Sequence, residues 1–208
     1  MLSRAPEAVD GRLSRTVRSR LAICEACLDL IQEGVLQPSA DQVAERAGLS
    51  RRSIFNHFAD LAELYDAVAE VGMQRCEPLL KKISAGEPLP RRIDLWIDAR
   101  AKFLEATAPF TRALTAQALV GAASDQAVRV SLEALRLYRD DFERLFGPEL
   151  APLPAPDRQD TVEAMAIATS PLSWEGLRRS RGLPMARARS VMRRTLLGLL
   201  REAGVDLP

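Results

Sequence analysis

The stretch from Ala47 to Phe58, with the sequence AGLSRRSIFNHF, decides the fold of this chain. Gly48 suits the end of one short helix, because glycine readily adopts the left-handed conformation that closes a helix, and Ser50 can cap the next. An apolar side (Ile54, Phe55, Phe58) and a polar side (Arg51, Arg52, Ser53, Asn56) follow. The stretch therefore predicts two short helices around a tight turn, the second with a polar face open to a partner.

Helical patterns continue upstream of this stretch. Apolar residues recur at three- and four-residue steps from Thr16 to Ile31, and Gly34 supplies a stop. Ser39 and Gln42 then have the spacing of a capping box, in which each residue satisfies a backbone N–H of the other. We expect this box to open a second short helix that ends at Gly48.

Downstream, Asp60 and Glu63 repeat the capping-box spacing and open a longer helix, which Pro78 is expected to kink or end. After a loop at 84–90, helical patterns follow at about 91–106, 109–121, 124–146, 157–180 and 184–203. The chain is therefore predicted to be all-α, with about nine helices. An N-terminal three-helix helix-turn-helix domain precedes a larger helical domain.

Prolines refine these boundaries. Pro109 and Pro184 suit first-turn positions, whereas Pro171 lies inside a helical pattern and predicts a kink. The connection before the last two helices is crowded with prolines, at positions 148, 152, 154 and 156. That segment is expected to be an extended, semi-rigid loop.

The composition agrees with a helical protein outside the membrane. Of the 208 residues, 47% are hydrophobic and only 5% are aromatic. The longest uncharged apolar stretches, such as 113–123, fall well short of the roughly 20 residues that a membrane span needs. The start, from Met1 to Glu7, carries an acid and a proline where a signal peptide needs an apolar run. We expect a cytoplasmic protein with no membrane partner.

The net charge of +1 does not by itself indicate a nucleic-acid partner, but the charge is unevenly distributed. Residues 1–20 carry five arginines against two acids. Residues 1–14 are therefore expected to form a flexible basic arm. Residues 15–62 form the helix-turn-helix domain of this prediction, and residues 63–208 form the larger helical domain.

The residues at 47–58, followed by Leu64, resemble the tetracycline-repressor (TetR) family. The family pattern is alanine-glycine-(valine or leucine)-serine, a short spacer, leucine-tyrosine-x-histidine-phenylalanine, and a leucine in the next helix. The likeness spans about Leu21 to Val68, and the rest of the chain resembles the family only in being helical and of the right length. The resemblance implies a bacterial, nucleoid-associated repressor. It would bind a near-palindromic DNA operator as a homodimer and respond to a small, largely apolar effector.

An exposed helix fits the major groove, where its side chains reach base edges and phosphates. The resemblance implies that the start of the second helix and the polar side of the third face the groove, with Phe55 and His57 toward the phosphates. The predicted DNA-binding residues are Ser39, Ala40, Ser50, Arg51, Arg52, Ser53, Phe55, Asn56 and His57. The sequence departs from the family pattern at Phe55, which lacks the tyrosine hydroxyl, and at Leu61, which replaces a usual lysine. Both departures weaken the expected phosphate contacts.

The larger helical domain is expected to bind the effector and to form the dimer. The predicted effector-pocket residues are Trp96, Phe103, Phe110, Tyr138, Met165 and Thr169. Each is also an ordinary core residue, and their role as a pocket is implied by the resemblance. The predicted dimer-interface residues are Trp174, Leu177, Val191, Met192, Thr195, Leu196 and Leu199. The alternative is that this apolar stripe completes the core of a single protomer.

Catalytic and metal chemistry find little support. His57 is the only histidine, so paired metal motifs and a nucleophile with a histidine base are absent from the sequence. Cys24 and Cys27 have CxxC spacing inside a helical pattern, which favours core packing, and whether Cys76 senses redox state stays open. We expect no catalytic residues, no metal and no cofactor. A helical adaptor that binds protein is the alternative function.

Overall fold

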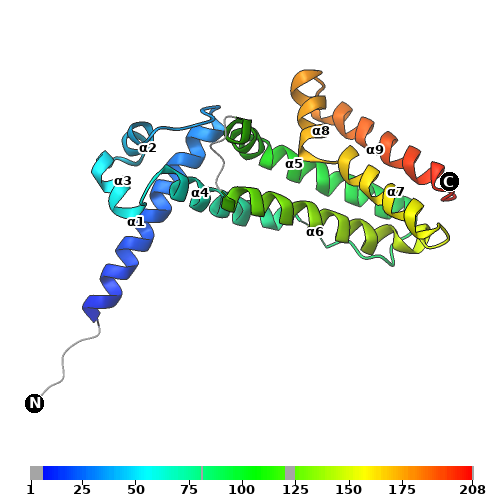
Figure 1. Ribbon diagram of the computed structural model, residues 1–208, viewed down its shortest axis with the longest axis horizontal. Coiled ribbons are helices and arrows are strands. Elements are labelled where there is room, and N and C mark those ends of the chain that lie inside the picture. Colours follow the sequence, from blue (N-terminus) through cyan, green and yellow to red (C-terminus); the bar gives the residue numbers. More distant parts are fainter. Residues whose placement is uncertain (1–6, 81, 120–124, 208) are drawn as a thin grey trace, which may run out of the picture. The chain divides into compact units, whose positions relative to one another are not determined.

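The computed structural model describes residues 7–80, 82–119 and 125–207, with side chains described for 15–80, 82–119 and 136–207. Throughout these ranges the regular structure is helical, and it includes nine α-helices (Figure 1). The prediction of an all-α fold is therefore confirmed. The helices divide between two compact units, Met1–Arg75 with Arg112–Ala127 and Cys76–Thr111 with Val128–Pro208.

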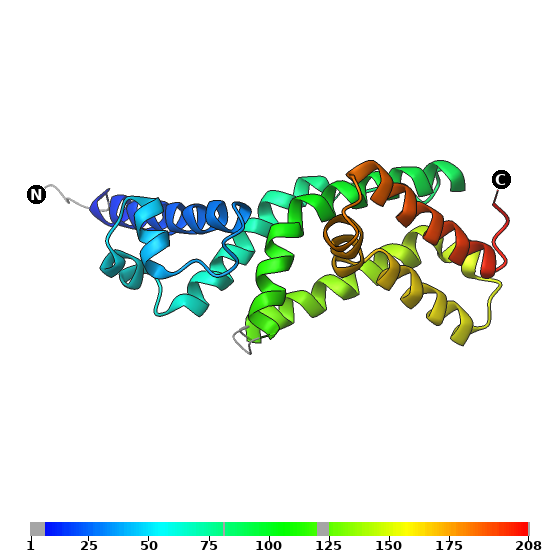
Figure 2. The same cartoon turned by 90° about the horizontal axis from the view of Figure 1, so that it is seen from above.

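The first unit contains the helix-turn-helix. Its helices are α1 (Glu7–Gln32), α2 (Ala40–Ala47), α3 (Arg51–His57) and α4 (Leu61–Cys76). Helix α1 packs against α2 and α3, as Figures 1 and 2 show, and α2 packs against α3. Helix α4 ends just before Pro78, as predicted. The buried core of this unit includes Ile23, Cys27, Leu28, Val43, Ile54, Phe58, Leu64 and Val68.

Helix α1 begins earlier than the sequence analysis predicted. Residues 7–14 are helical, so they are not the flexible arm that was expected there, and residues 1–6 lie outside the described range. The first unit also extends past residue 62, because it includes most of α4.

The second unit is built from five helices and their connections. They are α5 (Leu89–Leu119, of which the part before Arg112 belongs here), α6 (Asp125–Leu150), α7 (Ala155–Ala168), α8 (Pro171–Glu175) and α9 (Met185–Glu202). Helices α7 and α9 pack against each other. Aromatic rings fill part of the core, with the centroids of Trp96 and Phe142 4.7 Å apart and those of Phe142 and Phe146 6.0 Å apart. None of the described helices is both long and apolar enough to span a membrane.

Proline positions account for most differences from the predicted boundaries. Helix α5 runs through Pro109, where two helices were expected, and α6 continues through Pro148. A proline removes one backbone hydrogen bond from a helix, and long apolar faces on either side can outweigh that loss. By contrast, the single helix expected at 157–180 is divided at Ser170, whose hydroxyl caps α8 directly before Pro171. The proline-rich connection shortens accordingly, since α7 already starts at residue 155.

Several residues predicted for a dimer interface lie in the core of the protomer. Trp174, Met192 and Leu196 are each at most 1% exposed, so their side chains have no surface to offer a second copy. Leu177 and Leu199 are partly buried against the same core. For these five residues, the alternative stated above applies: the apolar stripe of the last helices completes the core of a single protomer. Of the predicted set, Val191 and Thr195 keep exposed surface on α9.

The burial of Leu196 predicts a large loss of stability on truncation. Leu196→Ala is expected to lower the free energy of unfolding by about 2–5 kcal/mol, because it leaves a cavity in a packed core. Leu137→Ala, at a side chain 61% exposed in the same unit, is the control and should cost less than about 0.5 kcal/mol. Chemical denaturation followed by tryptophan fluorescence measures both, since both tryptophans lie in this unit. Equal, small losses for the two variants would contradict the packing.

Candidate nucleic-acid interface

The turn between α2 and α3 has the caps that the sequence predicted. Ser39 and Gln42 form a complete capping box. The backbone N–H of Gln42 donates to Ser39 Oγ at 3.3 Å, and the backbone N–H of Ser39 donates to Gln42 Oε1 at 2.8 Å. Gly48 closes α2 with a φ of +66°, a conformation that costs other residues strain. Ser50 caps α3, because the Ser53 amide donates to its hydroxyl at 3.1 Å. The two short helices are thus held at a fixed turn.

Helix α3 has one buried side and one exposed side. Ile54 and Phe58 are at most 1% exposed, whereas Arg51, Arg52 and Asn56 are exposed. Phe55, which was expected on the apolar side, is instead 40% exposed. Successive helical residues are about 100° apart, so the residue after Ile54 cannot share its buried direction.

The charges on the exposed side of α3 are available to a partner. Arg51 pairs with Asp41 at 3.1 Å, but both side chains are more than 60% exposed, and such pairs contribute only about 0–1 kcal/mol. Within the described part of the chain, Arg52 makes no ion pair. The Arg51 guanidinium also lies 5.7 Å from the centroid of the Phe55 ring. Two cations therefore lie on one short exposed face, and the ion pair that Arg51 makes is weak enough to give way to another anion.

The start of α2 offers fewer groups for DNA contact than the resemblance to the TetR family implied. Ser39 is exposed, but its hydroxyl is already used by the cap, and Ala40 is 4% exposed, so its methyl group cannot reach a base. His57 is half-buried at the end of α3. What the geometry brings together on one exposed face is the set Arg51, Arg52, Phe55 and Asn56, with Ser50 and Ser53 beside them.

Arg20 is one of the five arginines among residues 1–20, but its side chain contacts the protein itself. Its guanidinium donates to the backbone carbonyl of His57 and pairs with Glu63 at 3.2 Å. It also stacks over the Phe58 ring, 4.1 Å from the centroid. The second oxygen of Glu63 accepts the Ala59 N–H at 2.7 Å. Arg20 therefore ties α1 to the end of α3 and the start of α4, and it is not a free cation for DNA.

This network lowers the pKa of Glu63, through the Ala59 N–H first and the Arg20 side chain second. A depressed carboxyl pKa stabilises the fold above the ordinary pKa of glutamate. That contribution is lost as the pH falls through the lowered value. The effect is small because the carboxylate is well solvated, so the network acts mainly by fixing the geometry of α3.

The three cysteines are buried free thiols. Burial raises the pKa of Cys24 to about 11 and that of Cys27 to about 12, and it also raises the pKa of Cys76. A thiol that keeps its proton is neither a good nucleophile nor a metal ligand. Among the described residues, no group of three or more His, Cys, Asp or Glu side chains is placed to hold a metal ion.

The residues predicted for an effector pocket lie in the second unit. Trp96, Phe103, Met165 and Thr169 are buried, while Phe110 and Tyr138 are half-buried. Four of the six contact or closely surround Arg100, a buried residue that the sequence analysis did not select. The available signal was a charged residue on the apolar face of a helical pattern, four positions after Trp96 and three before Phe103.

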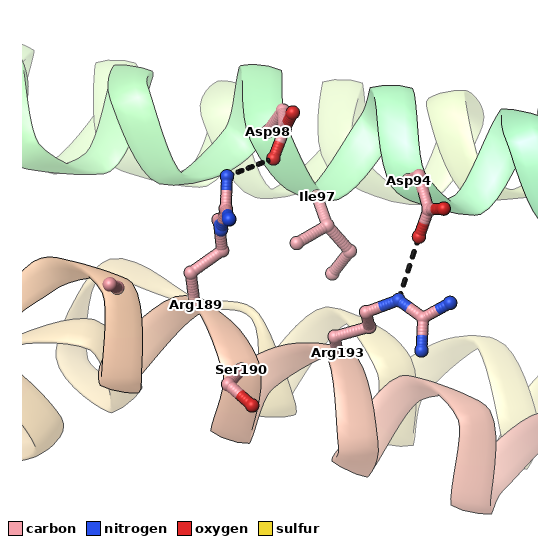
Figure 3. Close-up of a pocket in the computed structure, with 7 residues that line it drawn as sticks. Asp94, Ile97, Asp98, Arg189, Ser190 and Arg193 are labelled. Atoms are coloured by element: carbon pink, nitrogen blue, oxygen red, sulfur yellow. Dashed lines mark hydrogen bonds and ion pairs between the residues drawn. The ribbon is translucent and has the colours of Figure 1, made fainter.

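The structure places a pocket elsewhere in the second unit, between α5 and α9 (Figure 3). Its volume is about 360 Å³, and two ion pairs cross it, Asp98 with Arg189 at 2.6 Å and Asp94 with Arg193 at 2.7 Å. None of the six predicted effector residues lines this pocket. Four of its seven lining residues are charged and pair with one another, so it is not the apolar cavity that was expected.

The fold and the two-sided α3 together define an all-α helix-turn-helix protein with a helical second unit. This fold is similar to that of a transcriptional regulator from Rhodococcus sp. Rha1, with a TM-score of 0.70 over 91% of this chain and 98% of that chain. The two sequences are 16% identical, a level at which the similarity shows the shared fold. No protein-family model matches the sequence, and no curated protein matches it either.

The Arg20 network predicts the local stability of α3. Arg20→Ala is expected to speed amide hydrogen exchange across residues 51–63 by about tenfold, because it removes a charge-assisted hydrogen bond and a cation–π contact worth about 1–2 kcal/mol together. Arg75→Ala breaks the exposed pair of Arg75 with Glu25 and is the control, expected to change exchange there by less than about twofold. Unchanged exchange in both variants would contradict the role of Arg20 as a tie.

Proposed function

We propose that this chain is a DNA-binding transcriptional regulator that reads duplex DNA through α3. The observation that carries the proposal is the division of this helix into two sides. Ile54 and the C-cap residue Phe58 are buried, while Arg51, Arg52 and Asn56 are exposed. A helix fixed in this way can enter the major groove without losing its packing.

The exposed side chains have the chemistry that base recognition needs. An arginine can donate two parallel hydrogen bonds to guanine O6 and N7, and asparagine can pair in the same way with adenine. Arg51 gives up only an exposed ion pair with Asp41 when it binds DNA. Ser50, Ser53 and Phe55 border the same face and are suited to backbone contacts.

The TetR-like residues at 47–58 support a more specific role. We propose a repressor that binds a near-palindromic operator and is released or modulated by a small effector bound in the second unit. The shared fold with a transcriptional regulator supports this role at the level of architecture. A coupling of roughly 1–3 kcal/mol between effector and operator would alter operator affinity by about 5- to 150-fold.

The proposed regulator acts as a homodimer. A reader of seven residues covers too few base pairs for specificity alone, and a two-fold axis supplies a second reader. Because Trp174, Met192 and Leu196 belong to the protomer core, the surface left for a partner is the exposed side of α8 and α9. That side includes Leu172, Arg187, Val191, Arg194 and Thr195.

Substitution of Arg52 tests the reading helix. On a duplex that wild-type protein has selected from random sequence, Arg52→Ala is expected to weaken binding by about 5- to 150-fold, the loss of one bidentate base contact of about 1–3 kcal/mol. Gel-shift titrations across salt concentration measure the effect. Arg91→Ala removes an exposed arginine of α5 and is expected to bind as wild type does.

Binding by Arg52→Ala that equals wild type at every salt concentration would contradict α3 as the reader. The alternative, a helical adaptor, predicts that random DNA yields no selected duplex at all. The exposed arginines on α3 favour the DNA reader, since an adaptor surface needs no cations at those positions.

Charges placed on α9 test the dimer. Val191→Glu combined with Thr195→Glu sets like charges across a two-fold axis and should shift the protein from dimer to monomer in light scattering. Neither residue is fully buried, so circular dichroism of the double variant is expected to match wild type. The variant Asp157→Lys with Arg158→Glu, at exposed positions of α7, is the control and should stay dimeric. A folded α9 variant that remains dimeric would place the interface elsewhere.

A further inference from the structure

We propose that Arg100 binds the anionic group of the effector, and that the effector is an apolar molecule with a carboxylate. This inference rests on the proposed regulatory function, because it names the chemistry of the ligand that the second unit would recognise. The site consists of Arg100 on α5, Trp96 and Phe103 on the same helix, Tyr138 on α6 and Thr169 at the end of α7.

Arg100 is a buried cation, and no carboxylate of the described residues pairs with it. Arg100 is only 6% exposed. Within the described residues, no Asp or Glu lies at ion-pair distance from its guanidinium. The described acid that acts on its charge, Asp141, already accepts hydrogen bonds from Trp96 Nε1 at 2.9 Å and from Arg144 at 2.5 Å. Buried charges in proteins are normally paired, because an uncompensated ion loses its hydration.

A second buried arginine on the same helix provides the comparison. Arg92 is 3% exposed and forms an ion pair with Glu149, so this protein does supply a carboxylate where a buried guanidinium is purely structural. Both arginines are buried and lie on α5, and among the described residues only Arg92 has an acidic partner. Among the described residues, Arg100 therefore differs from Arg92 in having no acidic side chain to neutralise it.

The surroundings of Arg100 are aromatic. Its guanidinium carbon lies 3.6 Å from the centroid of the Tyr138 ring, 5.9 Å from that of Trp96 and 6.0 Å from that of Phe103. Aromatic faces attract a cation, but this attraction is smaller than the cost of taking the ion out of water. Burial accordingly lowers the pKa of Arg100, against a smaller opposing influence of Tyr138.

The hydrogen bonds that Arg100 makes within the protein do not occupy all the N–H donors of its guanidinium. Nε and Nη2 both donate to the Thr169 carbonyl, at 3.1 and 3.0 Å, at the junction between α7 and α8. A guanidinium has five N–H donors, and a carbonyl needs no positive charge to accept a hydrogen bond. The remaining donors can hold a carboxylate, the group whose geometry a guanidinium matches best.

The aromatic rings around Arg100 also favour an apolar skeleton for the rest of the ligand. Tyr138 covers one face of the guanidinium and is itself only half-buried, so a ligand reaches Arg100 by displacing this ring. Trp96 and Phe103 then provide an apolar wall beside the charge. A carboxylate attached to an aromatic or aliphatic hydrocarbon satisfies both features, whereas a small inorganic anion satisfies only one.

The test compares carboxylates with neutral molecules of the same skeleton. The probes are 2-naphthoate with 2-naphthalenemethanol, and dodecanoate with dodecanol, each titrated by calorimetry into the full-length protein. Wild type is expected to bind at least one carboxylate about 10- to 100-fold more tightly than its alcohol. Arg100→Gln, which can still donate to the Thr169 carbonyl, is expected to abolish this preference while keeping weak binding of the alcohol.

The controls separate this inference from loss of folding and from the proposed function. Arg189→Gln, at the paired pocket of Figure 3, is expected to keep the wild-type preference. If Arg100→Gln fails to fold, Arg100→Lys retains the charge and should keep a reduced preference. Wild type that prefers no carboxylate, or an Arg100→Gln protein that prefers one as strongly as wild type, overturns the inference. DNA binding without probes tests the regulator separately, so either claim can fail while the other stands.

Discussion

A helix of seven residues cannot hold its own shape in water, and this constraint governs the N-terminal unit. Helix α3 exists because Ile54 and Phe58 are buried against α1 and α2 and because Ser50 caps its first turn. Burial of one side necessarily turns the remaining positions outward, including both arginines. The face that is available for recognition is therefore a consequence of the way in which the helix is anchored.

The second unit shows how differently a protein can treat two buried cations. Arg92 is neutralised by Glu149, and Arg178 at the unit's periphery is paired with Glu105 at 2.6 Å. Arg100 is held only by a carbonyl and aromatic rings. An arrangement of this kind is costly for a protein that only has to fold, and it is useful for one that must bind an anion. The residues that form it come from three helices of one unit, α5, α6 and the end of α7.

The sequence allowed the local features to be predicted better than the long-range ones. The caps at Ser39, Gly48 and Ser50 and the stop before Pro78 were predicted, because each depends on a few neighbouring residues. The continuity of α5 through Pro109 was missed, since it depends on packing along the whole helix. The apolar stripe of α9 could not be divided between protomer core and dimer surface, because periodicity does not say which element covers a face. Arg20 and Arg100 were not recognised as contact centres for the same reason: the carbonyls that accept their hydrogen bonds belong to residues 37 and 69 positions away in sequence.

We propose that a two-fold pair of α3 helices reads DNA. This proposal is tested most directly by selecting duplexes from a random library with the full-length wild-type protein and sequencing those that remain bound. We expect an enriched, near-palindromic sequence whose half-sites are separated by about one helical turn or more. Retention of DNA with no enriched sequence, or of none at all, would contradict it.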